Sequence, residues 1–356
     1  MPTAEYRHFG CRIMEDLIYK GFRTVILENE ILRIGILLDK GADIFQFLHK
    51  PSDTDYLWRS PQGLIRRDQF TATRASTSGS FLDSYHGGWQ EILPGGGPAD
   101  FRGAELGLHG EVAQLGWEMD ILQDTSSRVS IKLSVNCIRT PLRLERIMTL
   151  ESGSPVLHFE ETLSNRSPEA IEFMWGHHPA FGAPFLKEGL RLFVPAATVN
   201  IHQPQFAESG IFEPGSQFAW PKINDQNGKA IDFSSLPSKE AGFADLVYLK
   251  DLQNGWYALI DVNSKIGFGL SWPKDVFPYI WFWMVFGKAP GYPWWDQVYV
   301  IALEPWTSMP NSLSQAHYQN TLFKLKGGES RTVSLCATAI EGKDTITNID
   351  QYGNVS

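Results

Sequence analysis

The segment Ile131-Lys-Leu-Ser-Val-Asn-Cys137 alternates apolar and polar side chains. Alternation with a period of two is typical of a β-strand that buries one face and exposes the other. We expect further strands of this kind at residues 23–27, 31–38, 156–163, 171–174, 256–261, 266–271, 297–303 and 332–339. No long stretch has helical periodicity. Strands that follow one another without intervening helices predict an all-β protein built as a large antiparallel β-sandwich or barrel.

This strand pattern continues from about residue 20 to about residue 340 without a linker or an internal repeat. We therefore expect one domain over residues 1–356, and 43% hydrophobic residues are enough for a large core. Two loop-rich insertions interrupt the pattern, at residues 60–104 and 197–241. Long loops on a rigid β scaffold are where binding residues usually lie.

The net charge of -9 opposes binding to nucleic acid or to an anionic membrane surface. The first residues lack the apolar core of a signal peptide, and no uninterrupted apolar stretch reaches the roughly 18 residues that a membrane span needs. We expect a cytoplasmic monomer or homodimer whose partner is a small, mostly neutral molecule. Three scattered cysteines indicate neither a disulfide framework nor a cysteine-rich metal site.

Two short segments place acid/base residues among aromatic ones, Trp175-Gly-His-His-Pro-Ala-Phe181 and Ala302-Leu-Glu-Pro-Trp-Thr307. We expect His177 and His178 at the end of the strand that carries Ile171, Phe173 and Trp175, before a turn at residues 179–182. Neighbouring residues on a strand face opposite ways, so only one of the two histidines can point into a shared pocket. Glu304 ends an apolar run, and desolvation there would raise the pKa of its carboxyl group. An imidazole and a carboxylate that face one ligand can move protons in both directions, and aromatic faces suit a sugar ring.

Each of these residues also has a structural interpretation. An adjacent pair of histidines is more often hydrogen-bonded within the fold, and Glu304 could pair with Arg74 or Arg102. His109 lies between Gly107 and Gly110, which allow close approach of the backbone to a ligand. Most of the twelve tryptophans are expected to belong to the core, with one or two in contact with a ligand.

A metal site has to be considered, because several potential ligands accompany these motifs: His109, Glu111, His177, His178 and Glu304. The sequence has no HxxxH or HxH spacing. We therefore expect neither a metal nor a cofactor.

Taken in order, the motifs resemble the aldose 1-epimerase (galactose mutarotase-like) superfamily over about residues 20 to 340. The matching positions are Gly87-Gly88, Pro94, His109-Gly110, Trp117, His178-Pro-Ala-Phe181, Asp245 and Glu304. The resemblance implies a galactose mutarotase-like supersandwich and a cofactor-free isomerase. Such an enzyme interconverts the α and β anomers of a free aldose or a close derivative.

Residue roles follow from the same resemblance. Glu304 matches the general base and His178 the general acid, while His109 and Asp245 match residues that bind the sugar. The chain departs from the best-known galactose mutarotases at Gly176-His177 and at Trp89-Gln-Glu91, so the substrate is expected to differ. The full set of residues expected to bind substrate is His109, Asp245, Arg74, Trp89, Glu91 and His177.

Two other functions remain open at the level of sequence. A β-sandwich with aromatic and carboxylate contacts could bind carbohydrate without turning it over. A glycoside hydrolase would need two carboxylates flanking the scissile bond, and Glu304 with Glu91 or Glu111 could supply them. An acid/base pair made of His178 and Glu304 favours the mutarotase, because binding alone does not need such a pair.

Overall fold

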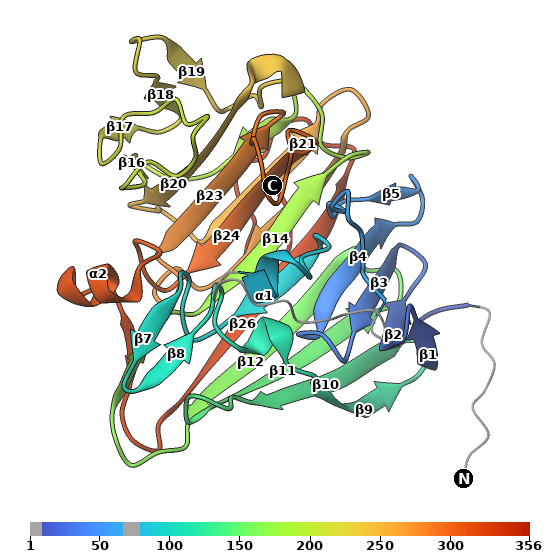
Figure 1. Cartoon of the computed structure of the whole chain (residues 1–356). Helices are drawn as coiled ribbons and strands as arrows, with labels where there is room; N and C mark the ends of the chain where they lie inside the picture. The colour runs from blue at the N-terminus through green and yellow to red at the C-terminus, as the bar shows by residue number, and fades with distance from the viewer. Residues whose placement is uncertain (1–8, 67–78) are drawn as a thin grey trace.

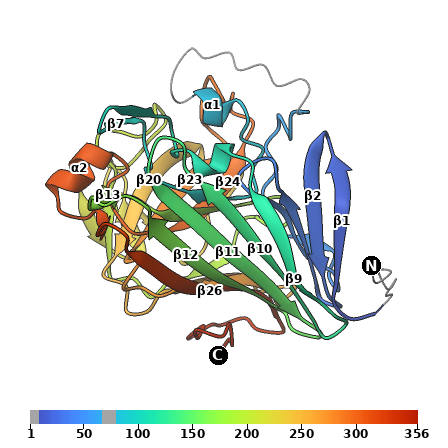
Figure 2. The same cartoon turned by 90° about the horizontal axis from the view of Figure 1, so that it is seen from below.

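The computed structural model of the chain describes residues 9–66 and 79–356. Two large sheets pack face to face (Figures 1 and 2). All pairings between named strands in the described part of the chain are antiparallel. The sequence thus predicted the fold class correctly, as a large antiparallel β-sandwich.

The larger sheet has twelve strands in the order β1-β2-β3-β4-β6-β14-β24-β23-β20-β16-β17, with β5 paired to β4. Their bounds are β1 (Arg12–Tyr19), β2 (Phe22–Glu28), β3 (Leu32–Leu37), β4 (Asp43–His49), β5 (Thr54–Asp55), β6 (Trp89–Ile92), β14 (Gly176–Gly182), β16 (Thr198–Ile201), β17 (Gln217–Ala219), β20 (Phe243–Lys250), β23 (Tyr279–Phe286) and β24 (Tyr299–Trp306).

The smaller sheet has eight strands in the order β15-β21-β22-β26-β12-β11-β10-β9. Their bounds are β9 (Glu118–Asp124), β10 (Arg128–Asn136), β11 (Leu142–Glu151), β12 (Val156–Asn165), β15 (Arg191–Phe193), β21 (Trp256–Asp261), β22 (Ile266–Ser271) and β26 (Ser330–Glu341). The quoted segment 131–137 lies almost entirely in β10, where Ile131 and Leu133 are fully buried.

Short elements complete the described structure. Three two-stranded sheets pair β7 (Ala99–Phe101) with β8 (Ala104–Leu106), β13 (Ile171–Phe173) with β25 (Phe323–Leu325), and β18 (Lys222–Asn224) with β19 (Ala230–Asp232). The helices are α1 (Gly79–Leu82), α2 (Leu313–Tyr318) and the 3-10 turns η2 (Val112–Gln114) and η3 (Lys239–Ala241). No helix in the described ranges is long and apolar enough to cross a membrane.

Aromatic side chains from both sheets meet in the main core. Phe47 on β4 and Phe181 on β14 pack on Phe268 of β22, with ring centroids 5.3 Å and 5.0 Å apart. Burying a ring of this size contributes about 1.5 to 3 kcal/mol relative to leaving it exposed. The core therefore fixes β14 in the middle of the larger sheet.

The larger sheet is also covered on its other face, so its central strands are apolar on both sides. Strand β23 has the sequence YIWFWMVF, in which Phe282 packs between the sheets while Trp281 and Trp283 face outward. The β7-β8 hairpin, α1 and several loops lie over this outer face (Figure 1). The outer face holds the candidate site.

The sequence misjudged the local structure around the two histidines. The strand with Ile171 and Phe173 is the short β13, and His177 and His178 lie on a separate strand, β14. Residues 179–182, expected to form a turn, belong to β14 as well. Between β14 and β24 the strand pairing is interrupted from Gly176 to Ala180. Pro179, which has no backbone N–H to donate, lies in this interruption.

Candidate active site

His178 and Glu304 come together on neighbouring strands. The pairs Gly176↔Trp306 and Ala180↔Ala302 between β14 and β24 set a register in which His178 lies opposite Glu304. The Nε2 atom of His178 is 3.4 Å from the Oε1 atom of Glu304. A Cβ atom on Gly176 would collide with the Trp306 ring, so glycine at this position allows the close approach. Two residues 126 positions apart in the sequence thus form one acid/base pair.

The carboxyl group of Glu304 is almost completely shielded from water. Its Oε2 atom accepts a hydrogen bond from Trp306 Nε1 at 2.9 Å, and the Trp306 ring stacks on Trp281 with centroids 3.8 Å apart. Burial raises the pKa of Glu304 to about 8, although the Trp306 hydrogen bond acts in the opposite direction. A carboxyl group in this state holds a proton at neutral pH and can exchange it.

His178 is buried beside Glu304. Because the Glu304 carboxyl group is itself protonated at neutral pH, it does not hold the imidazole in its charged form. Burial lowers the pKa of His178 to about 4. Its Nδ1 atom lies 3.3 Å from the hydroxyl oxygen of Tyr85, which can donate to a neutral ring or accept from a charged one. Burial raises the pKa of Tyr85 well above its ordinary value, so this phenol stays protonated.

Together, His178 and Glu304 hold one proton over a wide pH range. With the two pKa values at about 4 and about 8, the pair carries a single proton between these limits. With these pKa values the proton belongs to Glu304. If it moves to the imidazole, the same two residues become a carboxylate base and an imidazolium acid. Such a pair can remove one proton from a ligand while donating another.

His109 completes the polar group. Its backbone adopts a left-handed conformation with φ of 63°, next to Gly110 with φ of 69°, and its N–H donates to the carbonyl of Gly96 at 2.7 Å. The ring packs on His178 with centroids 5.1 Å apart. Burial, and then the neighbouring His178, lower the pKa of His109 well below its ordinary value. Among the described residues its buried Nδ1 atom has no hydrogen-bond partner, which leaves one polar atom of this ring unsatisfied.

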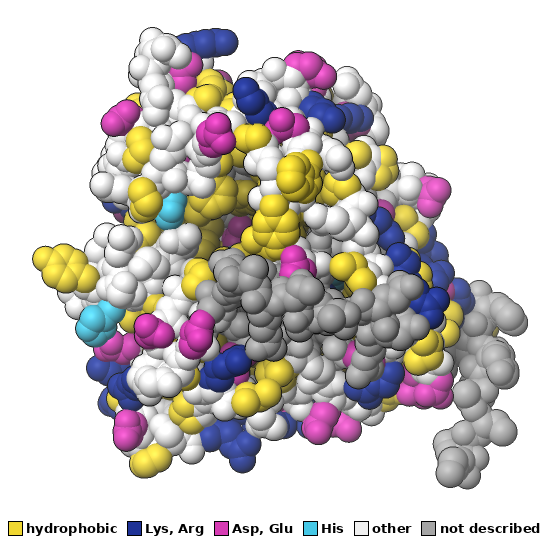
Figure 3. Space-filling view, in the orientation of Figure 1, with side chains coloured by type: hydrophobic (Ala, Val, Ile, Leu, Met, Phe, Trp, Pro, Cys, Tyr) yellow, Lys and Arg dark blue, Asp and Glu magenta, His cyan; other side chains and the backbone are white. Residues whose placement is uncertain are grey.

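A cavity of about 400 Å³ opens above these three side chains. Its residues are Phe81, Leu82, Tyr85, Gly96, Leu108, His109, His178, Phe206, Ala207, Glu208, Ala244, Leu246, Trp281, Trp283, Val285, Ala289, Pro290, Tyr292, Pro293, Trp294, Glu304 and Asn311. Figure 3 shows apolar side chains gathered around a hollow on this face, over β20 and β23. None of these lining residues, all in the described part of the chain, is Lys or Arg. The cavity therefore suits an uncharged ligand with apolar ring faces.

Three residues expected to bind substrate, Trp89, Glu91 and His177, lie on the opposite face of the sheet. Glu91 on β6 and His177 on β14 are neighbours across the two strands and point between the two sheets. Both side chains are completely buried there. His177 Nε2 is 3.2 Å from Glu161 Oε2 on β12, and Trp89 Nε1 donates to His177 Nδ1 at 3.4 Å. None of the three lines the cavity.

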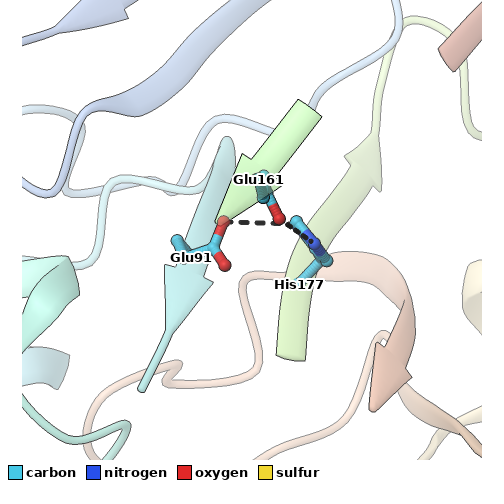
Figure 4. A group of neighbouring side chains, drawn as sticks. All are labelled: Glu91, Glu161 and His177. Carbon is cyan, nitrogen blue, oxygen red and sulfur yellow. Dashed lines mark ion pairs between the residues drawn. The ribbon is translucent and has the colours of Figure 1, made fainter. Parts of the chain in front are cut away.

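Glu91, Glu161 and His177 form a buried cluster between the sheets, and Arg146 on β11 compensates its negative charges. Its guanidinium group contacts Glu91 and donates to Glu161 Oε1 at 2.8 Å. Burial alone would lower the pKa of His177, but the carboxylates of Glu91 and Glu161 raise it above its ordinary value. Glu91 and His177 come from the larger sheet and Glu161 from the smaller one, so the cluster joins the two sheets (Figure 4).

The same cluster is the one group of three or more possible metal ligands in the described chain, formed by Glu91, Glu161 and His177. A divalent cation there would have to share both carboxylates with the buried guanidinium of Arg146. Like charges at such distances repel strongly in a dry interior. The donor set therefore fits a structural ion network better than a metal site.

Asp245 also faces away from the cavity. Its neighbours on β20, Ala244 and Leu246, line the cavity, so strand alternation turns Asp245 to the other side. Its Oδ2 atom accepts hydrogen bonds from the backbone N–H groups of Ile211 and Phe212 at 2.9 and 3.3 Å. Burial raises the pKa of Asp245 to about 6. Asp245 therefore holds the loop that brings Phe206 to the cavity.

The remaining expectations concern two arginines and a glutamate. Arg74 lies outside the described residues. Arg102 forms an exposed ion pair with Glu169 at 3.1 Å, so it is not the partner of Glu304. Glu111 accepts hydrogen bonds from the backbone N–H groups of residues 138, 139 and 140, so it caps a turn instead of facing a ligand.

Sequence reasoning did not find Tyr85, Phe81 or Asn311, all of which line the cavity. Tyr85 stands just before the Gly87-Gly88 motif, and only its contact with His178 reveals a functional position. The sequence also did not separate Trp281 and Trp283, which line the cavity, from the tryptophans expected in the core. Their alternation with Phe282 on β23 is the signal that could have separated wall residues from core residues.

Comparison with known proteins supports the architecture. The family model described as "Domain of unknown function (DUF4432)" matches residues 19–338. No curated protein matches the chain. A solved structure described as a "putative aldose 1-epimerase" from Klebsiella pneumoniae superposes with a TM-score of 0.71 at 17% identity, over 93% of this chain and 83% of the other.

Two further solved structures agree with it. A galactose mutarotase related enzyme from Lactobacillus acidophilus has a TM-score of 0.59 at 16% identity, over 91% of this chain and all (100%) of the other. A galactose mutarotase-like protein from Clostridium acetobutylicum has a TM-score of 0.60 at 12% identity, over 94% and 99%. Identities this low establish the fold alone. The chain has the galactose mutarotase-like fold, as the resemblance predicted.

Proposed function

The chain belongs to the family described as a domain of unknown function (DUF4432), and we propose that it is an aldose 1-epimerase acting on a neutral aldose or a close derivative. The observation that carries the proposal is the contact between His178 and Glu304 at 3.4 Å on the wall of an aromatic cavity. The pair holds one proton between about pH 4 and pH 8. Anomer exchange needs one base and one acid at the same moment.

The proposed reaction uses the single proton that His178 and Glu304 share. Glu304, as the carboxylate, removes the proton of the anomeric hydroxyl group, while His178, as the imidazolium, protonates the ring oxygen. The bond between C1 and the ring oxygen breaks, and its electron pair stays with that oxygen as C1 becomes the aldehyde carbon. After rotation about the C1–C2 bond, the reverse transfers close the ring on the other face. The pair ends with the same single proton that it began with.

The surroundings support this chemistry in two ways. Tyr85 can hydrogen-bond His178 in either protonation state, which keeps the ring in place during both transfers. His109 lies beside His178 and lines the same cavity, so its ring can contact the sugar next to the reacting atoms. The absence of Lys and Arg from the described lining favours a neutral sugar over a phosphorylated one, because buried phosphate is usually met by such residues.

The two competing functions receive less support. A glycoside hydrolase would need a second carboxylate across the scissile bond from Glu304. Glu91 is enclosed between the sheets and Glu111 is engaged by backbone N–H groups, so neither candidate faces the cavity. A sugar-binding protein without catalysis would gain nothing from a buried carboxyl group whose pKa is raised to about 8. A desolvated carboxyl of this kind is typical of a catalytic group.

Exchange NMR tests the proposal directly. Equilibrated solutions of neutral aldoses, among them pentoses, hexoses and deoxyhexoses, are measured with and without the protein, and magnetisation transfer between the two anomeric protons gives the exchange rate. We expect the protein to accelerate exchange of at least one neutral aldose. Acceleration confined to sugar phosphates would contradict the proposed substrate class, and binding without acceleration of any sugar would contradict the proposed reaction.

A further inference from the structure

A second hollow lies next to the cavity, on the same face of the larger sheet. This groove has a volume of about 650 Å³ and is bordered by β16, α2 and two loops. Four amide side chains line it, those of Asn200, Gln203, Gln315 and Gln319. None of its lining residues, which all fall within the described ranges, carries a charge. The groove therefore suits a neutral, polar ligand.

The groove and the cavity share one wall. Tyr248 lines the groove, and its ring packs on Trp281 of the cavity with centroids 5.6 Å apart. The Tyr248 hydroxyl oxygen lies 2.6 Å from His202 Nδ1 and accepts the N–H of Asn311, a cavity residue, at 3.1 Å. These bonds make the wall a fixed partition.

Two loops pass from one hollow to the other. Pro204 borders the groove and Phe206 borders the cavity, two residues later in the same loop. Pro310 and Asn311 are divided in the same way on the second loop. A ligand longer than one sugar ring could therefore extend from the cavity over this partition into the groove.

The lining has the chemistry of carbohydrate recognition. An amide group both donates and accepts hydrogen bonds, which matches the hydroxyl groups of a sugar. The side chain of Tyr318 on α2 is 87% exposed at the edge of the groove and offers an aromatic face for the C–H side of a ring. Asn200 also lines the groove, and its buried Oδ1 atom has no hydrogen-bond partner in the described structure, so the groove wall contains an unsatisfied acceptor.

We propose that the groove binds a second sugar unit linked to the one in the cavity, so that the protein acts on the reducing end of a short oligosaccharide. This inference rests on the proposed function, because the reducing unit is the one presented to His178 and Glu304. The groove supplies affinity for the substrate and takes no part in the proton transfers.

The test compares sugars with their dimers in the exchange assay. The pairs are glucose with maltose and with cellobiose, xylose with xylobiose, and galactose with β-1,4-galactobiose. For the preferred unit, we expect kcat/KM for the dimer to exceed that for the single sugar by at least about tenfold. The double variant Gln203→Ala/Gln315→Ala should remove this advantage and leave kcat/KM for the single sugar within about twofold. Gln253→Ala, at an exposed position outside both hollows, is the matched control.

Methyl glycosides of the same dimers separate this inference from the proposed function, because they cannot open at C1. Saturation-transfer NMR should show contact with both units of a methyl glycoside in the wild type. In the double variant it should show contact with the reducing unit alone. That result supports the groove even if no sugar is turned over. Equal kcat/KM for dimer and single sugar, or contact with one unit only in the wild type, would overturn the inference while leaving the mutarotase proposal intact.

Discussion

Replacing Glu304 by Gln should stabilise the folded protein at alkaline pH, because the buried carboxyl group resists ionisation. Its pKa rises from an ordinary value of 4.5 to about 8. Below pH 4.5 the group is protonated in both the folded and the unfolded chain, so it costs nothing. As the pH rises from 4.5 to 8, the unfolded chain ionises first, and the folded protein loses stability relative to it.

The size of the effect follows from the same shift. At about 1.36 kcal/mol per pKa unit, a rise from 4.5 to about 8 corresponds to a loss on the order of 5 kcal/mol once the pH exceeds 8. Gln cannot ionise, and its side-chain oxygen can still accept the hydrogen bond from Trp306. The variant should therefore avoid the loss without leaving the Trp306 N–H unpaired.

Urea denaturation at pH 5 and pH 9 measures this difference. We expect wild type and Glu304→Gln to have similar free energies of unfolding at pH 5, and the variant to be more stable by several kcal/mol at pH 9. Glu208→Gln makes the same chemical change at an exposed position on the cavity rim and should show no such pH dependence. If the gap between wild type and Glu304→Gln does not widen with pH, the carboxyl group is not desolvated as described.

The other predictions concern the proton pair and the cluster behind it. The kcat/KM for anomer exchange should fall both above about pH 8 and below about pH 4, because only the one-proton form of the pair has a base and an acid; a steady rise through pH 8 would show that the shared proton is not needed. His178→Asn should lower turnover by a factor on the order of 10² to 10⁴, whereas His177→Asn should lower it much less. If the exchange assay shows the larger loss for His177→Asn, the side of β14 that faces the substrate has been misassigned. Arg146→Met should destabilise the protein by about 3 to 5 kcal/mol, since it removes the guanidinium group that pairs with two buried carboxylates. Arg143→Met on the same strand should cost about 1 kcal/mol or less, and equal losses in urea denaturation would argue against the network. Chelation of divalent metal ions should leave anomer exchange unchanged, and activity restored only by an added metal would contradict the proposed chemistry.

The sequence predicted the all-β sandwich, and it named His178 and Glu304, which the structure brings into contact. Period-two patterns located the strands of both sheets because one or both faces of each strand are buried, as in β10 with Ile131 and Leu133. The alternation of side chains along a strand also predicted that His177 and His178 would point to opposite faces of the sheet. Which of the two faces the cavity depends on Arg146 and Glu161, which come from the other sheet and draw His177 between the layers.

Long-range packing explains what the sequence did not provide. Asp245 looked suitable for a sugar, but only the placement of Ala244 and Leu246 in the cavity wall shows that it faces the other way. Tyr85 carries no local signal, because its role depends on a contact with a residue 93 positions away. Such errors arise where a choice of face is made by a partner distant in the chain, and strand periodicity alone does not identify that partner.

The central claim, that Glu304 is the base for anomer exchange, is tested most directly by the Glu304→Gln variant on a sugar that the wild type accelerates. Gln retains the shape and hydrogen-bonding reach of Glu but cannot accept the anomeric proton. We expect the folded variant to bind the sugar within about tenfold of the wild-type affinity, while anomer exchange measured by NMR falls toward the spontaneous rate. Exchange as fast as with the wild type would contradict the mechanism.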